Sequence, residues 1–119
     1  MSEPITTSLA DVDPATFEVV KNSLYSAAEE MRVVLAKTAY SPILKVAGDY
    51  SCGIFDVHGD MVAQGPDLPI HLGSMPPTVK AVIEAWDEIA PGDVFIHNDP
   101  YNGGSHLPDV NVVTPAFAD

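Results

Sequence analysis

The sequence predicts an α+β fold in which a long N-terminal helix, a β-hairpin, a second helix and mixed short strands form part of a larger domain. Apolar residues recur at helical spacing from Asp13-Pro14 to about residue 40. Residues 51–64 instead read as two short strands about a glycine-bearing turn. No βαβ repeat occurs. The long helix has a wide apolar stripe, and the few other elements are too small to cover it. We therefore expect a further segment or partner to pack on this helix.

The composition is that of a globular, acidic chain. Its 119 residues suit one domain, with 46% hydrophobic and 18% charged residues. Seventeen acidic residues against five basic ones give a formal charge of -12, so we expect no nucleic-acid partner and no anionic membrane surface. No apolar run approaches the roughly 20 residues that span a bilayer. The lone Cys52 cannot form an internal disulfide, which predicts a cytoplasmic protein.

The expected elements follow from capping and breaking signals along the chain. Residues 1–12 lack periodicity and predict a flexible arm before the main segment, 13–119. Proline at position 14 suits a first helical turn, and Ser41-Pro42 ends that helix. Four prolines and two glycines predict an irregular but stiff loop at 65–77. The remaining expectations are a hairpin at 51–64, a helix from Pro76-Pro77 to Ile89, and strands at 93–96 and 110–114.

The polar loop from His97 to Asp109 is the strongest candidate for chemistry. His106 and Asp109 are three residues apart with a proline between them, so a turn could direct both side chains at one ion. A histidine nitrogen with a carboxylate oxygen suits Zn²⁺, Mn²⁺ or Fe²⁺, and no thiolate lies nearby. The alternative is structural: Asp109 caps a turn and His106 packs against it. The spacing alone leaves both interpretations open.

The first half of the same loop favours a structural interpretation. His97 and Asp99 form a second possible ligand pair, but Asp99-Pro100 is also an ordinary turn starter whose carboxylate bonds its own backbone. Gly103 and Gly104 permit positive φ angles or the close approach of a substrate to the backbone. They are not part of a phosphate loop, because the chain contains neither GxxxxGK[ST] nor GxGxxG.

Two further segments carry polar groups. Asp49 leads into the hairpin, where a carboxylate can reach a neighbouring loop. Cys52, three residues later, is interpreted as a small buried residue rather than a nucleophile. His71 lies in the stiff loop and is either a ligand or substrate contact or a structural hydrogen-bonding group. His58, in the hairpin turn, is expected to be exposed and inert.

These residues together resemble the N-terminal part of the hydantoinase B/oxoprolinase family, whose members are also called HyuB-like proteins. The resemblance runs from Asp13 to the end of the sequence. It rests on the opening helix, Ser41-Pro42, Asp49-Tyr50-Ser51-Cys52 with Phe55-Asp56, His71-Leu72-Gly73-Ser74-Met75, Gly92-Asp93, and Asn98-Asp99-Pro100-Tyr101-x-Gly103-Gly104-x-His106-Leu107-Pro108-Asp109.

The resemblance implies a catalytic subunit that works with an ATP-using, HyuA-like subunit. Such enzymes hydrolyse cyclic amides, and related ones carboxylate ketones such as acetone or acetophenone. The partner, with ATP and Mg²⁺, phosphorylates the amide or enol oxygen, and the HyuB-like subunit completes the reaction at a metal. By resemblance, the ligands in this chain are Asp49, His106 and Asp109, and Asp99 or His71 orients substrate or supports the ligands.

The resemblance also implies that the site is incomplete within these 119 residues. The family's fourth ligand is a histidine beyond Asp119, and three ligands alone would hold a metal weakly. We therefore expect activity only in a complex with the remaining HyuB-like segment and the ATP-using subunit. A non-catalytic assembly module, in which helix 14–40 docks on partners, is the alternative.

Overall fold

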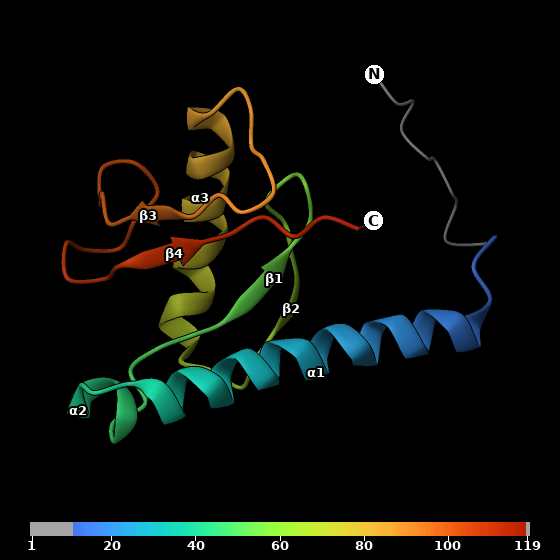
Figure 1. Cartoon of the computed structure of the whole chain (residues 1–119), viewed down its shortest axis with the longest axis horizontal. Coiled ribbons are helices and arrows are strands. Elements are labelled where there is room, and N and C mark those ends of the chain that lie inside the picture. The colour runs from blue at the N-terminus through green and yellow to red at the C-terminus, as the bar shows by residue number, and fades with distance from the viewer. Residues whose placement is uncertain (1–10, 119) are drawn as a thin grey trace.

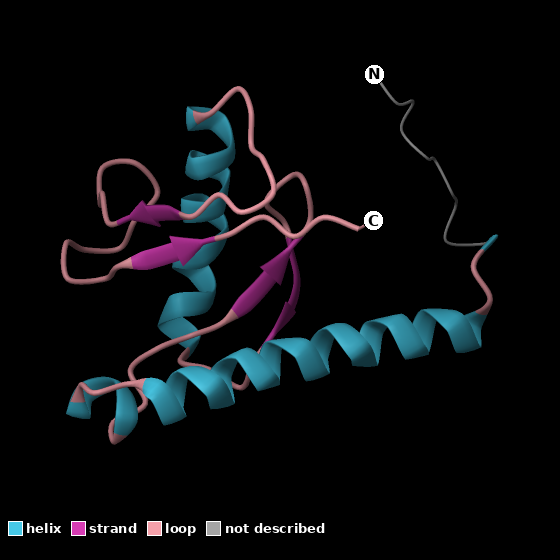
Figure 2. Cartoon of the chain, viewed as in Figure 1, coloured by secondary structure: helices cyan, strands magenta, loops and turns pink. Residues whose placement is uncertain are grey.

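The computed structural model describes residues 11–118 and confirms the α+β class (Figure 1). The arm expected at residues 1–12 lies outside this range except for its last two residues. The elements in order are α1 (Pro14–Thr38), α2 (Pro42–Lys45), β1 (Gly53–Phe55), β2 (Met61–Gln64), α3 (Pro69–Ala85), β3 (Phe95–His97) and β4 (Asn111–Val113). The strands form two separate antiparallel pairs, β1 with β2 and β3 with β4 (Figure 2).

Helix α1 confirms the long helix expected at 14–40, although it ends two residues earlier. The Asp13 carboxylate accepts a hydrogen bond from the backbone N–H of Thr16 at 3.0 Å and so caps the first turn. Ala39 leaves the helix in an extended conformation, in keeping with the Ser41-Pro42 break. The connection after it contains a four-residue helix, α2, that the sequence did not predict. Its first residue is Pro42, a favoured opening position.

The hairpin expected at 51–64 is confirmed. Gly53 pairs with Gln64 and Ile54 with Ala63, and a bulge shifts the register before Phe55. Within its turn, the Asp56 carboxylate accepts hydrogen bonds from the backbone N–H groups of His58 and Asp60, both at 2.9 Å. The hairpin packs on the middle of α1, as Figure 1 shows. This packing fixes the position of the residues that precede β1 relative to α1.

The irregular loop and the late helix start predicted around Pro76-Pro77 are wrong. Helix α3 begins at Pro69 and passes through both prolines. An interior proline costs about 3 kcal/mol because it removes a hydrogen bond and crowds the preceding turn. Packing outweighs this cost, since Met75 is buried on the same side as Val79 and Val82, at helical spacing across the prolines. His71 is therefore a helical residue in the first turn of α3.

The other end of α3 and the last two strands lie close to their predicted places. The helix ends at Ala85 rather than Ile89, because Trp86 turns to an extended conformation and packs against Phe95, with ring centroids 5.6 Å apart. Strands β3 and β4 pair with Phe95 opposite Val113 and His97 opposite Asn111. The loop 98–110 connects them.

The core of the described residues is small. Its buried hydrophobic residues are Ala28, Cys52, Ala63, Met75, Val79, Ala81 and Val82. Helix α1 contributes only Ala28, while Val19, Val20 and Val34 on that helix are each more than half exposed. In Figure 1 the N-terminal half of α1 extends beyond the other described elements. So large an exposed apolar surface fits a segment of a larger domain.

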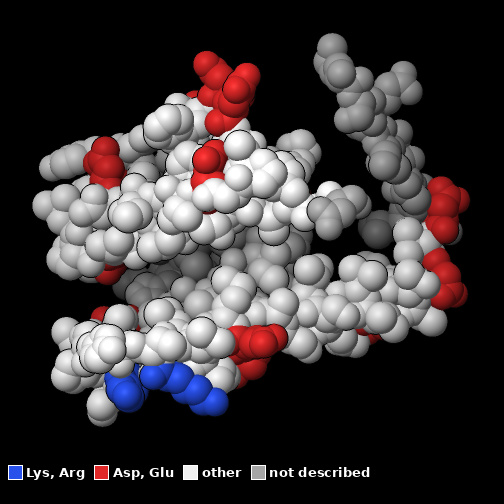
Figure 3. All heavy atoms as spheres, viewed as in Figure 1, with Lys and Arg blue, Asp and Glu red and all other residues white. Residues whose placement is uncertain are grey.

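Charges on the viewed face are unevenly distributed. Figure 3 shows acidic side chains scattered over this face, whereas Lys and Arg gather over the C-terminal end of α1 and over α2. No helix in residues 11–118 is both long enough and apolar enough to cross a membrane.

Candidate functional site

The loop 98–110 is shaped first by Asp99. Its carboxylate accepts a hydrogen bond from the backbone N–H of Tyr101 at 2.9 Å, and its carbonyl accepts one from Gly104 N–H at 2.9 Å. The structure thus favours the turn-forming interpretation of Asp99-Pro100. The His97 side chain also stabilises the loop, since its Nε2 lies 2.8 Å from the carbonyl oxygen of Asn102. A role for Asp99 beside substrate or ligands stays a prediction.

Gly103 allows the loop to lie against α3. It has φ +87°, and a Cβ at this position would lie 2.6 Å from the Pro77 carbonyl oxygen. Thr78, which is 1% exposed, donates its hydroxyl to the Gly103 carbonyl at 2.8 Å. A Cβ on Gly104 would come equally close to the carbonyl oxygen of Asp99. Both glycines are therefore required by close backbone approach within the chain, and contact with a substrate stays a prediction.

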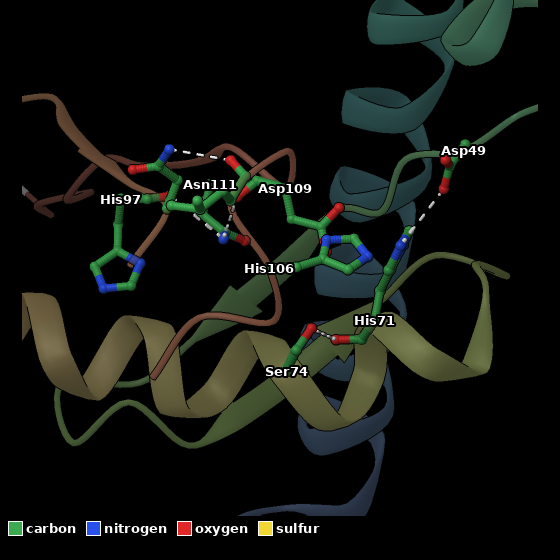
Figure 4. A network of polar contacts seen from close by, with 9 residues as sticks. Asp49, His71, Ser74, His97, His106, Asp109 and Asn111 are labelled. Atoms are coloured by element: carbon green, nitrogen blue, oxygen red, sulfur yellow. Dashed lines mark hydrogen bonds and ion pairs between the residues drawn. The ribbon is translucent and has the colours of Figure 1, made fainter. Parts of the chain in front are cut away.

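His106 and Asp109 meet at the far end of this loop, as their spacing predicts. Nδ1 of His106 lies 2.8 Å from Oδ2 of Asp109, and the backbone N–H of Asp109 donates to the His106 carbonyl at 2.9 Å (Figure 4). The His106 side chain is 70% exposed, which leaves room for a further group to reach the ring. Asn98 supports the turn by donating its side-chain N–H to the carbonyl of Leu107 at 3.1 Å.

The His106–Asp109 pair fits a divalent metal chemically. Two ligand atoms that share one tetrahedral ion at 2.0–2.2 Å lie about 3.4 Å apart, so the 2.8 Å contact would have to widen by only about 0.6 Å. A nitrogen and a carboxylate oxygen are the donors that Zn²⁺, Mn²⁺ and Fe²⁺ share. The same contact is also compatible with the turn cap that the sequence left open.

Asp49 belongs to a second pair, with His71. A turn after α2 places Asp49, whose backbone N–H donates to the Ile43 carbonyl at 3.1 Å. Its Oδ1 lies 3.6 Å from Nε2 of His71, in the first turn of α3. The other ring nitrogen of His71, Nδ1, lies 2.7 Å from the hydroxyl of Ser51. The structure thus joins His71 to side chains of the segment before β1.

The two pairs do not form one cluster of three ligands. In the view of Figure 4, His106 lies between Asp109 and His71, with Asp49 beyond His71. Within residues 11–118, however, no group of three His, Cys, Asp or Glu side chains converges closely enough to hold a metal. The described residues therefore offer two partial sets of donors, and the three-ligand set implied by the resemblance stays a prediction.

A buried carboxylate, that of Asp67, joins α1 and the segment before β1 to the segment that leads into α3, and the sequence did not reveal this. The Asp67 side chain is 1% exposed; its Oδ1 accepts from Nε of Arg32 at 3.1 Å, and its Oδ2 accepts from the backbone N–H of Cys52 at 2.9 Å. Arg32 and Asp67 are 35 residues apart, so no local pattern indicates this contact. The sequence showed both Ser51 and His71, but it did not show that their side chains are in contact.

Cys52 is buried, as expected for a small core residue, and this has a measurable consequence. Burial raises the pKa of its thiol, and the nearby Asp67 carboxylate raises it further. Because the folded state holds this proton more tightly, its contribution to stability is complete below the unfolded-state pKa of about 8.5 and is lost as pH rises through the folded-state pKa. We expect the unfolding free energy to fall more steeply between these two pKa values than in Cys52→Ala.

Thiol reactivity gives an independent check of the same effect. Iodoacetamide should alkylate native Cys52 more slowly than the denatured chain at neutral pH, because the thiolate is the reactive form and the folded state disfavours it. Equal rates in the two states, or parallel stability curves for the unaltered chain and Cys52→Ala at alkaline pH, would contradict this assignment.

The described residues define an α+β segment that presents two histidine–carboxylate pairs beside one helix. The family model for hydantoinase B/oxoprolinase matches residues 13–119, and the chain belongs to this family. It is 40% identical over 109 residues to a 5-oxoprolinase of Saccharomyces cerevisiae, which covers 91% of this chain and 8% of the yeast protein. It is 47% identical over 107 residues to the caprolactamase subunit beta of Pseudomonas jessenii, covering 89% of this chain and 18% of that subunit.

A plant relative extends the comparison. The chain is 39% identical over 120 residues to 5-oxoprolinase 1 of Arabidopsis thaliana, which covers 97% of this chain and 10% of the plant protein. The chain thus spans less than a fifth of the length of each of these three relatives.

Proposed function

We propose that this chain is part of an ATP-dependent enzyme that hydrolyses cyclic amides. The observation that carries the proposal is the match over residues 13–119, together with relatives named for 5-oxoproline and caprolactam. Both names refer to a ring that contains an amide bond. A role in breaking that bond is the chemistry the two relatives share, and it agrees with the function the resemblance implies.

The donor groups support a divalent-metal site to which Asp49, His106 and Asp109 contribute. A bound Zn²⁺, Mn²⁺ or Fe²⁺ would act as a Lewis acid and lower the pKa of a bound water. His106 and Asp109 already face each other and offer one nitrogen and one oxygen donor 2.8 Å apart. His71 and Asp99 would orient substrate or ligands, and the remaining HyuB-like segment would supply the other ligands.

The proposed partner is a HyuA-like subunit that binds ATP and Mg²⁺ and activates the amide oxygen by phosphorylation. The name of the Pseudomonas relative, a subunit beta, supports a partner subunit for that protein. Phosphorylation of the amide oxygen makes the ring carbon electrophilic, so that water can add and the C–N bond can break. A second water then releases the phosphoryl group as inorganic phosphate.

Two alternatives remain. One is an ATP-dependent carboxylase of ketones such as acetone or acetophenone, as the family resemblance allows. The other is an assembly module, and the exposed apolar surface of α1, including Val19, Val20 and Val34, favours it.

A substrate test on the assembled protein separates these functions. We expect ATP-dependent ring opening of 5-oxoproline, caprolactam or a hydantoin, measured by mass spectrometry together with release of ADP. Labelled bicarbonate entering acetone or acetophenone would instead identify a carboxylase. If the chain is an assembly module, omitting it should leave the turnover of the remaining subunits unchanged.

A further inference from the structure

Ser51 is a polar residue that the proposed function does not use. It lies just before β1, and its hydroxyl oxygen is 2.7 Å from Nδ1 of His71. The opposite nitrogen of the same ring, Nε2, is 3.6 Å from Oδ1 of Asp49. Figure 4 shows the His71 side chain extending from α3 toward Asp49. Three side chains therefore lie in a row, with a hydrogen-bonding contact between the hydroxyl and the imidazole and a longer, electrostatic contact between the imidazole and the carboxylate.

The row has only one favourable arrangement of protons when the ring is neutral. A neutral imidazole carries a proton on one nitrogen and a lone pair on the other. If Nδ1 donated to Ser51, the lone pair of Nε2 would face the Asp49 carboxylate, and the two would repel. If Ser51 donates to Nδ1, the N–H of Nε2 faces the carboxylate and attracts it. The second arrangement also gives the Ser51 hydroxyl an acceptor for its proton.

The burial of the row supports a defined geometry. The His71 side chain is 19% exposed, whereas that of Asp49 is 53% exposed. The ring is thus held within the protein, and the carboxylate lies at the surface, where it is free to contact a further group. The Asp67 carboxylate, which bonds the backbone of the neighbouring Cys52, fixes the segment that carries Ser51.

We propose that Ser51 and His71 are positioning residues for Asp49, in which the Ser51 hydroxyl selects the His71 tautomer that carries its proton on Nε2. The N–H at Nε2 then orients Asp49 and leaves its second oxygen available. This inference rests on the proposed function, in which Asp49 is a metal ligand, because support of a ligand is what gives the row a functional consequence. Loss of such support typically costs 10–100-fold in metal affinity.

The tautomer can be measured without metal or turnover. Two-bond ¹⁵N–¹H correlation spectra of the full 119-residue chain, under alkaline conditions in which imidazoles are neutral, show which nitrogen carries the proton. We expect a proton on Nε2 of His71 in the unaltered chain and in Ser51→Thr, which keeps the hydroxyl. Ser51→Ala should convert this signal to a mixture of both tautomers.

A matched control distinguishes the contact with the His71 ring from a contact with the His71 backbone. Ser74 contacts the same histidine, but it donates to the His71 backbone carbonyl at 3.1 Å rather than to the ring. Ser74→Ala should leave the tautomer unchanged. A proton on Nδ1 of His71 in the unaltered chain, or one averaged signal for all four histidines, would overturn the proposal.

The affinity of the assembled protein for Zn²⁺, measured against a competing chelator, tests the consequence. We expect Ser51→Ala to weaken Zn²⁺ binding by roughly tenfold or more, and Ser51→Thr to restore it. If the tautomer changes as expected while Zn²⁺ affinity does not, the tautomer assignment stands and the metal role proposed for Asp49 fails. If affinity falls equally in Ser74→Ala, the effect is structural and the positioning role is wrong.

Discussion

Replacing both His106 and Asp109 with alanine is expected to remove the divalent metal from the assembled protein and to abolish its ATP-dependent turnover. The two side chains are 2.8 Å apart on one turn and offer one nitrogen and one oxygen donor. Loss of a supporting residue alone costs 10–100-fold in metal affinity, so loss of two ligands should cost on the order of 100-fold or more. Elemental analysis of the purified protein and initial rates of ring opening measure the two effects.

A double substitution of the same residue types provides the control. His58 and Asp87 are both exposed and lie outside the loop 98–110. His58→Ala with Asp87→Ala should retain full metal content and turnover. The proposed site would be wrong if the His106/Asp109 variant kept both its metal and its activity, and a loss of activity with metal retained would assign the pair a role other than ligation.

The elements that could be predicted are those specified by local sequence. Helix α1 follows from its apolar spacing, the Asp13 cap and the Ser41-Pro42 break, and each of these acts within a few residues. The hairpin likewise follows from its turn. The start of α3 could not be predicted in this way, because Pro76 and Pro77 signal a break that burial of Met75 and Val79 overrides.

The contacts of the candidate site likewise fall into those between near neighbours in the sequence, which could be predicted, and those between distant residues, which could not. His106 and Asp109 meet because three residues and a proline separate them, which the sequence shows directly. The contact of His71 with Ser51 and Asp49 depends on how α3 packs against the segment before β1, and its residues are about 20 positions apart. Gly103 was expected to permit either a positive φ or the close approach of a substrate, but the sequence could not show that α3 itself occupies the space beside it.

Replacing Arg32 with alanine is expected to destabilise the fold by roughly 2–4 kcal/mol. The substitution leaves the Asp67 carboxylate, which is 1% exposed, without its charged partner. A buried charge that loses its partner typically costs 3–5 kcal/mol, and the 32% exposure of the Arg32 side chain reduces this value. Unfolding in urea, followed by circular dichroism, gives the change in free energy.

Lys21→Ala is the matched control on the same helix. Lys21 pairs with Glu18 at 2.9 Å, but both side chains are more than 40% exposed, so its loss should cost less than about 0.5 kcal/mol. Arg32→Ala combined with Asp67→Asn should cost less than the sum of the two single changes, because the pair is coupled. A strictly additive result would mean that the 3.1 Å contact contributes no coupling energy.

The Arg32–Asp67 pair also bears on the site, because Asp67 lies two residues before α3 and bonds the residue that follows Ser51. If the pair holds Ser51 against His71, Arg32→Ala should broaden or mix the His71 tautomer signal under conditions in which the chain is still folded. Lys21→Ala should not. A conformational constraint on Asp49 would then begin at Arg32, in the C-terminal half of α1.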